Sequence, residues 1–181
     1  MEKGHIIFLN GTSISGKTTI AKDLQANLSE PYIHISCDDF ICMYPEWFWG
    51  PMGHEEIFKR YIPGIISGLH RCVGALAKSG NNLIVEHVLY EKGWFEECVE
   101  HWDGLDVLFV GVKCPLEITE QREKERGDRS IGTARVQYEL VHAHRLYDIE
   151  VDTSILKVDE CVTRIMELVK NKPTRADFRK Q

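Results

Sequence analysis

A glycine-rich loop between a strand pattern and a helix pattern places the strongest constraint on how this chain folds. The loop, Gly11-Thr-Ser-Ile-Ser-Gly-Lys-Thr18, matches the pattern G-x-x-x-x-G-K-[ST] at every required position. It follows the apolar, β-prone run Ile6–Leu9 and precedes residues 19–28, where apolar residues recur at helical spacing. Strand, loop and helix in this order predict an anion-binding site at the edge of an α/β sheet. The alternative is a glycine-rich turn with an incidental lysine.

Each residue type in the loop has a physical task in binding phosphate. Glycines let successive backbone N–H groups point at phosphate oxygens, and the dipole of the following helix adds positive charge. Lys17 is predicted to reach the outer phosphates, and the Thr18 hydroxyl to ligate Mg²⁺. ATP and Mg²⁺ are therefore the predicted cofactors. The predicted nucleotide-binding residues of this segment are Gly11, Thr12, Ser13, Ile14, Ser15, Gly16, Lys17, Thr18 and Thr19.

Composition and charge narrow the class of protein. The 181 residues are 43% hydrophobic and 28% charged, as expected for one globular domain over residues 1–181. A net charge of −6 weighs against nucleic acid as the main partner. No apolar run is long enough to cross a membrane, and Met1–His5 leaves no room for a signal peptide. The six cysteines are scattered and form no C-x-x-C pair, which favours location in a reducing cytoplasm. The sequence is also compatible with a homo-oligomer.

Strand and helix patterns alternate along the chain, which predicts a parallel sheet with helices on its faces. The predicted strands are His5–Asn10, Tyr32–Ser36, Asn82–Val88, Asp106–Lys113 and Asp148–Val151. Beyond the loop, the predicted helices cover 55–79, interrupted or kinked at Pro63-Gly64, and then 91–101, 115–125, 133–144 and 158–170. The polar tail 171–181 is expected to be mobile. Because ligands of such sheets bind at the carboxyl ends of strands, the candidate residues are those that follow strands.

Two aspartates follow the second predicted strand. A carboxylate there would face the phosphate loop, where it can take the proton of an acceptor hydroxyl or hold Mg²⁺ through water. Asp38 or Asp39 can instead cap the next helix, because Asp is a favoured N-cap residue. We expect one residue in each role, with Asp38 as the catalytic one.

Glu86 and His87 lie near the end of the third predicted strand. An acidic residue at the end of an apolar strand is typical of a carboxylate that orients Mg²⁺ and its waters, so Glu86 joins Thr18 as a predicted metal-binding residue. The alternative for Glu86 is a solvated charge at the strand end. His87 is open to substrate contact, but a hydrogen bond to a neighbouring loop is the favoured interpretation.

The segment 122–129 is rich in arginine and contains Gly127. A planar guanidinium suits phosphate oxygens. Downstream of a phosphate loop, such a segment predicts a lid near residues 122–135 that closes over ATP and excludes water. Arg126 and Arg129 are the candidates that supply positive charge during transfer. The alternative is a solvated helix end with mixed charges in i,i+4 pairs.

Two further segments border the predicted site. The aromatic cluster within Phe40–Trp49 lies just after Asp38 and predicts either a mobile acceptor pocket or the packing of a cap over the core. The triplet 152–154, Asp-Thr-Ser, follows the fifth strand and is a weaker candidate for a loop beside adenine. His142 and His144 lie two apart and share no helix face, so no metal site is predicted there.

The chain resembles the chloramphenicol phosphotransferase family, small P-loop kinases that modify an antibiotic hydroxyl. Beyond the loop, the similarity is densest over 106–114, Arg122-Glu123, Arg126–Arg129, Val141-His142 and 147–153. The resemblance implies the P-loop nucleoside triphosphate hydrolase fold, with five parallel strands as in nucleotide kinases. It also implies that Asp38 is the general base, and that Arg122, Arg126 and Arg129 are lid arginines, the first two among the nucleotide-binding residues.

The chain departs from the family pattern at several positions. A single glycine, Gly11, stands where the family tends to have two, and Thr12–Ile14 is bulkier than usual. Glu86-His87 stands in place of two expected aspartates, and Tyr44–Glu56 does not resemble the acceptor region.

We expect an ATP- and Mg²⁺-dependent phosphotransferase acting on a hydroxylated small molecule. The acceptor classes are chloramphenicol-like compounds, which would connect the protein with antibiotic resistance, and metabolites. The alternatives are a kinase for a nucleoside, nucleotide or polynucleotide end, and a non-catalytic nucleotide-binding module.

Overall fold

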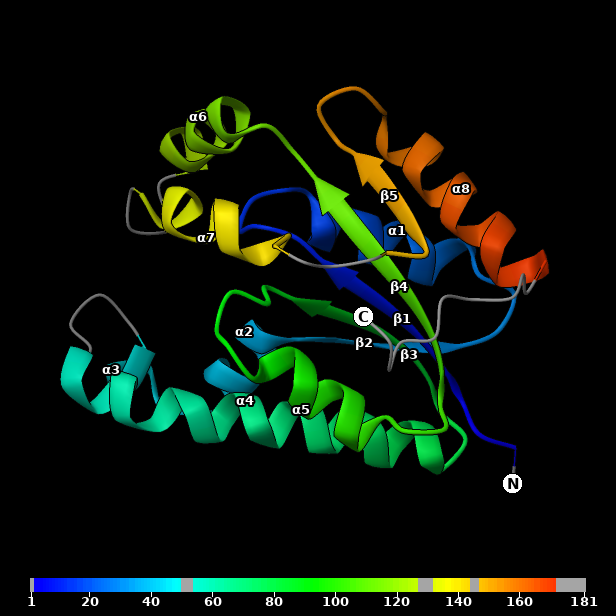
Figure 1. Ribbon diagram of the computed structural model, residues 1–181, viewed down its shortest axis with the longest axis horizontal. Coiled ribbons are helices and arrows are strands. Elements are labelled where there is room, and N and C mark those ends of the chain that lie inside the picture. Colours follow the sequence, from blue (N-terminus) through cyan, green and yellow to red (C-terminus); the bar gives the residue numbers. More distant parts are fainter. Residues whose placement is uncertain (1, 50–53, 127–131, 144–146, 172–181) are drawn as a thin grey trace.

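The computed structural model describes residues 2–49, 54–126, 132–143 and 147–171, and its centre is a parallel sheet of five strands (Figure 1). The strands are β1 (His5–Asn10), β2 (Tyr32–Ser36), β3 (Asn82–His87), β4 (Asp106–Lys113) and β5 (Ile149–Asp152). Their order is β2-β3-β1-β4-β5, and every pairing is parallel. The predicted α/β class with five parallel strands is confirmed, with strand bounds within one residue of those expected.

Helices cover both faces of the sheet. They are α1 (Lys17–Asn27), α2 (Cys37–Cys42), α3 (Glu46–Trp49), α4 (Glu55–Lys78), α5 (Trp94–His101), α6 (Leu116–Arg126), α7 (Thr133–Val141) and α8 (Val158–Asn171). Figure 1 shows α4 and α5 along one face and α1 and α8 along the other, with α6 beyond the tip of β4. Among the described residues, no helix is both long and apolar enough to span a bilayer.

Alternation along the strands separates two cores. Phe8 and Val85 belong to the core under α4 and α5, whereas Ile7, Leu9 and Ile84 belong to the core under α1 and α8. All five side chains are fully buried. Because successive side chains of a strand point to opposite faces, residues that are adjacent at a strand end serve different layers. This geometry places the last two residues of β3 on opposite sides of the sheet.

Several helical segments differ from the prediction. Helix α4 runs unbroken through Pro63, so the predicted interruption at Pro63-Gly64 is wrong. Both residues are exposed, so the carbonyl that proline leaves unpaired can bond to water while the buried side of the helix stays docked. Helix α5 begins three residues later than expected, after Gly93 with φ of 93°. The short helices α2 and α3 lie in a segment for which no helix bounds were predicted.

Several predicted features lie outside the described residues. These are the tail beyond residue 171, the lid residues 127–131, which include Arg129, and His144. Helix α7 ends at Val141 with His142 as its C-cap, three residues before the predicted end. The six cysteines are free thiols, of which three are buried.

Candidate active site

The phosphate loop joins β1 to α1 and is held in a tight turn. Gly11 lies so close to β4 that a Cβ atom there would be 2.4 Å from the carbonyl oxygen of Val112. Gly16 has a φ of 96°, and Ile14 has a φ of 64°. A β-branched residue in the left-handed region is strained. The loop therefore holds a backbone conformation that its own residues do not all prefer, as is common where a backbone must surround a ligand.

The side chain of Lys17 turns back onto the phosphate loop. Its Nζ donates to the carbonyl oxygens of Gly11, at 2.9 Å, and Thr12, at 2.7 Å, and the residue is buried. A buried ammonium needs such partners because desolvation is costly. The arrangement places a positive charge at the centre of the loop, where an anionic phosphate can bind.

Glu86 connects the loop helix to the edge of the sheet. Thr18 Oγ1 donates to Glu86 Oε2 at 2.8 Å, and His34 Nε2 lies 2.6 Å from Glu86 Oε1. Glu86 is buried, so the interpretation as a solvated strand-end charge is wrong. The structure therefore brings together the two predicted metal-binding residues, Thr18 and Glu86. Both have side-chain oxygen atoms, which are the ligands that Mg²⁺ prefers. His34 escaped the sequence analysis because only the pairing of β2 with β3 brings it to Glu86.

The two aspartates after β2 have different positions. Asp39 forms a capping box with Ser36: its carboxylate accepts from Ser36 N at 2.7 Å, and Ser36 Oγ accepts from Asp39 N at 3.2 Å. Asp38 lines the cavity at the phosphate loop. Burial, followed by the charge of Asp38, raises the pKa of the neighbouring Cys37 thiol to about 12. The expected division between a capping and a site-lining aspartate therefore matches the positions of both residues.

Most of these residues line one cavity of about 620 Å³. Because β1 is central, two sets of residues, one from each side of the phosphate loop, line the cavity. We call them the nucleotide end and the strand end. The nucleotide end includes Gly16, Lys17, Thr19, Arg122, Arg126, Thr153 and Lys157. The strand end comprises Ser36, Cys37, Asp38, Glu86, His87 and Val88. The sheet order thus separates the residues that suit a nucleotide from those that follow β2 and β3.

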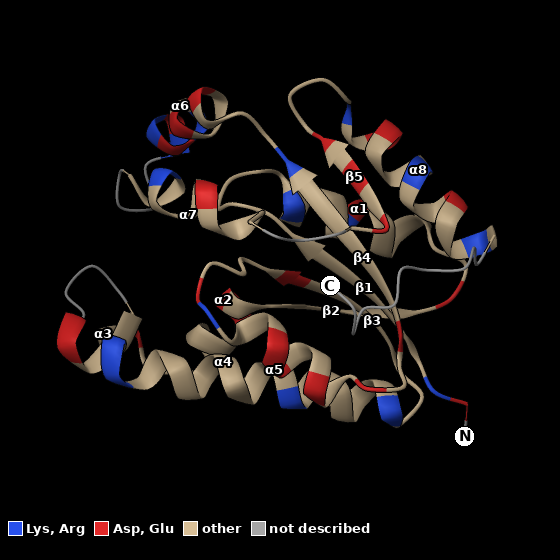
Figure 2. Ribbon diagram, in the orientation of Figure 1, with Lys and Arg blue, Asp and Glu red and all other residues tan. Residues whose placement is uncertain are grey.

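Arg122 is anchored rather than extended into solvent. Its guanidinium donates to the carbonyl oxygen of Thr153 at 3.0 Å and to Thr153 Oγ1 at 3.2 Å. Thr153 Oγ1 in turn donates to the carbonyl oxygen of Ser15 at 2.8 Å. These bonds connect α6 and the segment after β5 to the phosphate loop. The predicted lid arginines Arg122 and Arg126 both line the cavity, and Figure 2 shows basic and acidic residues mixed along their helix α6.

A second set of bonds holds α7 against the sheet. The carboxylate of Glu123 is buried and accepts from Gly132 N at 2.7 Å and Ala134 N at 3.0 Å, at the start of α7. At the other end of α7, Asn10 Nδ2 donates to the carbonyl oxygen of Val141 at 2.8 Å. Helix α7 also reaches the phosphate loop directly, because Gln137 Oε1 accepts from Ser13 N at 2.9 Å. The sequence analysis missed Gln137, whose helix is separated from the loop by more than a hundred residues.

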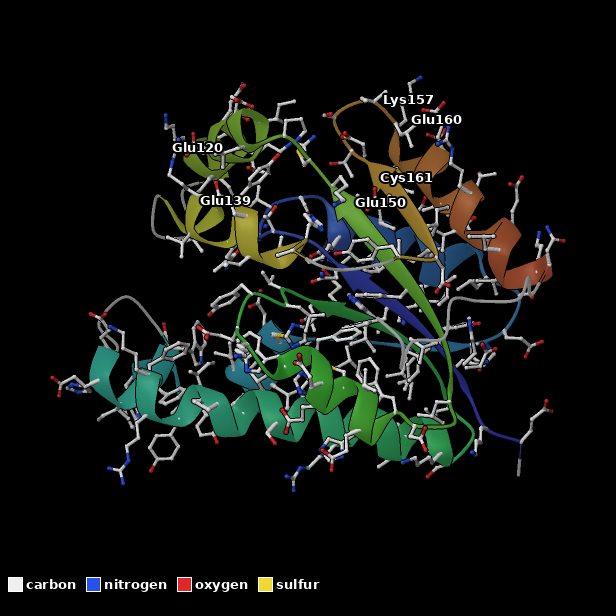
Figure 3. All side chains as sticks on the ribbon, viewed as in Figure 1. Glu120, Glu139, Glu150, Lys157, Glu160 and Cys161 are labelled. Atoms are coloured by element: carbon white, nitrogen blue, oxygen red, sulfur yellow. The ribbon has the colours of Figure 1, made fainter. Side chains whose placement is uncertain are left out.

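The segment after β5 closes the nucleotide end. Figure 3 shows Lys157 and Glu160 together at the start of α8, and Glu160 Oε2 accepts from Lys157 N at 2.8 Å. Leu156 and Lys157 line the cavity beside Thr153. The weak prediction of a loop beside the nucleotide at 152–154 therefore falls on a segment that does line the cavity.

The aromatic cluster lies away from the cavity. Phe48 is buried against Tyr44, Phe58 and Tyr61, with ring centroids 4.6 to 6.1 Å apart, while Trp47 is exposed. None of the described residues of Phe40–Trp49 lines the cavity. The described part of the cluster therefore packs α2 and α3 on α4, as in the cap alternative. It does not line this cavity, and the acceptor pocket stays a prediction.

Comparison with known proteins agrees with this geometry. The sequence model of the family described as "Chloramphenicol phosphotransferase-like protein" matches residues 4–170. The chain belongs to this family. A Mycobacterium tuberculosis (strain H37Rv) protein named "Putative O-phosphotransferase" is 30% identical over 186 residues, which cover 92% of this chain and 83% of the relative. Membership supports a kinase-like phosphotransferase, as the resemblance indicated.

Solved structures confirm the fold of this family member. The Mycobacterium tuberculosis APS kinase CysC in complex with AMPPNP and APS has a TM-score of 0.69 at 14% identity, covering 94% of this chain and 99% of that one. Shikimate kinase from Aquifex aeolicus has a TM-score of 0.57 at 15% identity, covering 92% and 97%. At these identities the likeness concerns the fold, which is the P-loop kinase fold predicted from the sequence.

Proposed function

We propose that this protein transfers the γ-phosphate of ATP to a hydroxyl group of a small molecule in a Mg²⁺-dependent reaction. The observation that carries the proposal is that Lys17 and Asp38 line the same cavity, one within the phosphate loop and the other at the strand end. A bound phosphate chain and an acceptor hydroxyl therefore have a common space in which to meet. The family membership and the kinase neighbours support the same reaction class.

The loop residues bind the nucleotide in this mechanism. Lys17 exchanges the carbonyl oxygens of Gly11 and Thr12 for phosphate oxygens, and the loop amides donate to the remaining ones. Thr18 and Glu86 would hold Mg²⁺, Glu86 through water, and the ion would neutralise charge on the transferred group. His34 orients the Glu86 carboxylate from the opposite side.

Asp38 acts on the acceptor. Its carboxylate takes the proton of the acceptor hydroxyl while the acceptor oxygen forms the new bond to the γ-phosphorus. The bond from that phosphorus to the β–γ bridging oxygen breaks, and its electron pair leaves with ADP. Arg126, together with Arg129 beyond the described residues, supplies positive charge to the transferred group. In this scheme the acceptor is a small molecule of the cytoplasm, and the net charge of −6 weighs against nucleic acid as the acceptor.

An acceptor screen tests the proposal. The protein is incubated with ATP and Mg²⁺ and with chloramphenicol, nucleosides, short oligonucleotides or pooled hydroxylated metabolites, and mass spectrometry detects the addition of one phosphate. We expect one small-molecule class to be phosphorylated, and no product with Asp38→Asn. ATP binding without transfer to any compound would instead identify a non-catalytic nucleotide-binding module, and transfer to oligonucleotides alone would contradict the small-molecule acceptor.

A further inference from the structure

Thr153 joins helix α6 to the phosphate loop through hydrogen bonds that the mechanism above does not use. Its Oγ1 lies 3.2 Å from Arg122 Nη1 and 2.8 Å from the carbonyl oxygen of Ser15. Its backbone is held as well: the N–H donates to the carbonyl oxygen of Lys113 at 3.0 Å, and the carbonyl oxygen accepts from Arg122 Nη2 at 3.0 Å. Thr153 therefore has a fixed position beside the loop.

The chemistry of these groups fixes the direction of each bond. A guanidinium donates hydrogen bonds and cannot accept them, so the Thr153 hydroxyl accepts from Arg122. The single proton of the hydroxyl can then go to the carbonyl oxygen of Ser15, at 2.8 Å, or of Lys113, at 3.5 Å. The bond to Ser15 is favoured, because 3.5 Å exceeds the usual length of a hydrogen bond between oxygen atoms. Arg122 thus leaves the hydroxyl as a donor to Ser15.

The bond to Ser15 sets the orientation of the next amide group. The peptide unit between Ser15 and Gly16 is planar and trans, so its C=O and N–H groups point in opposite directions. With the carbonyl turned to Thr153, the N–H of Gly16 points away from Thr153. No acceptor for this N–H exists within the described part of the chain, and Gly16, the N-cap of α1, has no side-chain capping bond.

Another peptide unit of the loop has the reverse orientation. The carbonyl oxygen of Thr12 points into the loop, where it accepts from Lys17 Nζ at 2.7 Å. The N–H of Ser13, in the same peptide unit, points out of the loop to Gln137 Oε1 at 2.9 Å. In the unit of Gly16 it is the carbonyl that bonds to a residue outside the loop, so the N–H points inward. Gly16 and Lys17 both line the cavity.

The backbone between these two peptide units is strained. Ile14 has a φ of 64°, which is unfavourable for a β-branched residue. The bond from Thr153 to Ser15 restrains the loop after Ile14, and the bond from Ser13 to Gln137 restrains it before Ile14. Without the hydroxyl of Thr153, the following peptide unit loses the partner that keeps its carbonyl turned outward.

We propose that Thr153, aligned by Arg122, is a positioning residue that holds the N–H of Gly16 toward a phosphate oxygen of the bound nucleotide. The inference rests on the first step of the proposed function, which is nucleotide binding at the phosphate loop. Anions bind at helix N-termini through such uncapped amides. Arg122 contributes to phosphate binding through Thr153, in addition to any contact of its own with the nucleotide.

NMR can observe this peptide unit selectively. Labelling serine carbonyls with carbon-13 and glycine nitrogens with nitrogen-15 selects the Ser-Gly units 15–16, 67–68 and 79–80, and Ser67→Ala and Ser79→Ala assign the first by elimination. We expect AMPPNP with Mg²⁺ to move the Gly16 amide proton downfield, as a new hydrogen bond does, and to move it less in Thr153→Val. A resonance that stays in place at saturation overturns the proposal, and so does a full shift in Thr153→Val.

Two substitutions at position 153 separate the hydroxyl from packing. Thr153→Val keeps the methyl group beside Gly16 but removes the hydroxyl, whereas Thr153→Ser keeps the hydroxyl. We expect Thr153→Val to raise the Kd of ATP and of inorganic tripolyphosphate about tenfold each, and Thr153→Ser to retain most of both affinities. A loss for ATP alone would indicate contact with the base or ribose and overturns the proposal. An equal loss in Thr153→Ser indicates a packing role and overturns it too.

A double-mutant cycle tests the alignment by Arg122. If Arg122 acts through Thr153, Arg122→Met should weaken tripolyphosphate binding less in the Thr153→Val background than in the original protein. Additive losses would show that Arg122 acts on phosphate independently and would overturn its positioning role. These measurements need nucleotide binding but no phosphate transfer. If no compound is phosphorylated, the proposed transfer reaction fails, whereas the Gly16 resonance still decides the role of Thr153.

Discussion

The nucleotide end and the strand end of the cavity are built in different ways. At the nucleotide end, eight consecutive residues, Gly11–Thr18, supply backbone amides, one ammonium and a helix terminus. At the strand end, Asp38 comes from the start of α2, directly after β2, and Glu86 and His87 are the last two residues of β3. Glu86 and His87 each bond to a side chain from another element. The first part depends on local backbone conformation, and the second depends on the sheet.

This difference indicates a division of labour. A phosphate chain is the same in every ATP-dependent kinase, so a local backbone motif can bind it in many proteins. An acceptor differs from one enzyme to the next, and side chains at the strand ends can change without altering the loop. Changes at the strand end should therefore affect transfer, and changes at the nucleotide end should affect ATP binding.

The largest expected effect is at Asp38. Asp38→Asn removes the proton acceptor, and we expect phosphate transfer to fall about a hundredfold or more while ATP affinity stays nearly intact. Single-turnover assays and ATP titration measure the two quantities. Asp39→Asn is the matched control, since Asp39 caps α2, and it should retain transfer. Unchanged transfer in Asp38→Asn would exclude this carboxylate from the mechanism.

Lys17→Ala tests the nucleotide end of the cavity. Loss of a buried ammonium that binds phosphate should weaken ATP binding about ten- to a hundredfold, as measured by calorimetry. Lys22→Ala, on the exposed side of the same helix, should bind ATP normally. Normal ATP affinity in Lys17→Ala would refute the assignment of the loop as the nucleotide site.

Glu86 belongs to the strand end but bonds to Thr18 of the phosphate loop, so its substitution tests how the two ends are connected. Glu86→Gln keeps groups that can bond to Thr18 and His34 but removes the charge, so the Mg²⁺ concentration for half-maximal transfer should rise about tenfold. Glu96→Gln, an exposed change on α5, is the control. An unaltered Mg²⁺ requirement would reduce Glu86 to a purely structural partner of His34.

Gly11→Ala examines the dependence of the loop on backbone space. Its Cβ would meet the carbonyl oxygen of Val112 at 2.4 Å, so we expect the free energy of unfolding to fall by about 1–3 kcal/mol in urea denaturation. Gly68→Ala in α4 has open space around the new Cβ and should stabilise the protein by about 0.5–1 kcal/mol. Equal effects of the two changes would show that the loop tolerates extra volume.

The smallest expected effect concerns the thiol beside Asp38. Because the Asp38 charge contributes to the raised pKa of Cys37, Asp38→Asn should increase alkylation of Cys37 by iodoacetamide several-fold, although the thiol stays mostly protonated. The exposed Cys42 provides the internal reference for the reagent, and mass spectrometry of peptides separates the two sites. If Cys37 is alkylated at the same rate in Asp38→Asn, the charge of Asp38 is too far from the thiol to affect its pKa.

Features that depend on neighbouring residues in the sequence were predicted correctly, whereas features that depend on contacts between distant residues were not. The strand Val107–Val110 was recognisable because both of its faces are buried, which leaves a continuous apolar run. The course of α4 through Pro63 was not recognisable, since it depends on the docking of the helix on the sheet. The choice between a cap and an acceptor pocket for the aromatic segment after Asp38 stayed open for a similar reason, because contacts with α4 decide where Phe48 packs.

By itself, the sequence determined the phosphate loop, the parallel α/β sheet and the positions of Asp38 and Glu86 at strand ends, because those features depend on contiguous residues and on the edge where parallel strands end. Only the tertiary structure decided which side chains form hydrogen bonds with the residues at the strand ends. The pairing of β2 with β3 brings His34 to Glu86, and the docking of α4 and α5 connects His70 and Glu97 to His87. These hydrogen bonds join residues that lie 17 to 52 positions apart in the chain, and such distances close only when the sheet and its helices have packed.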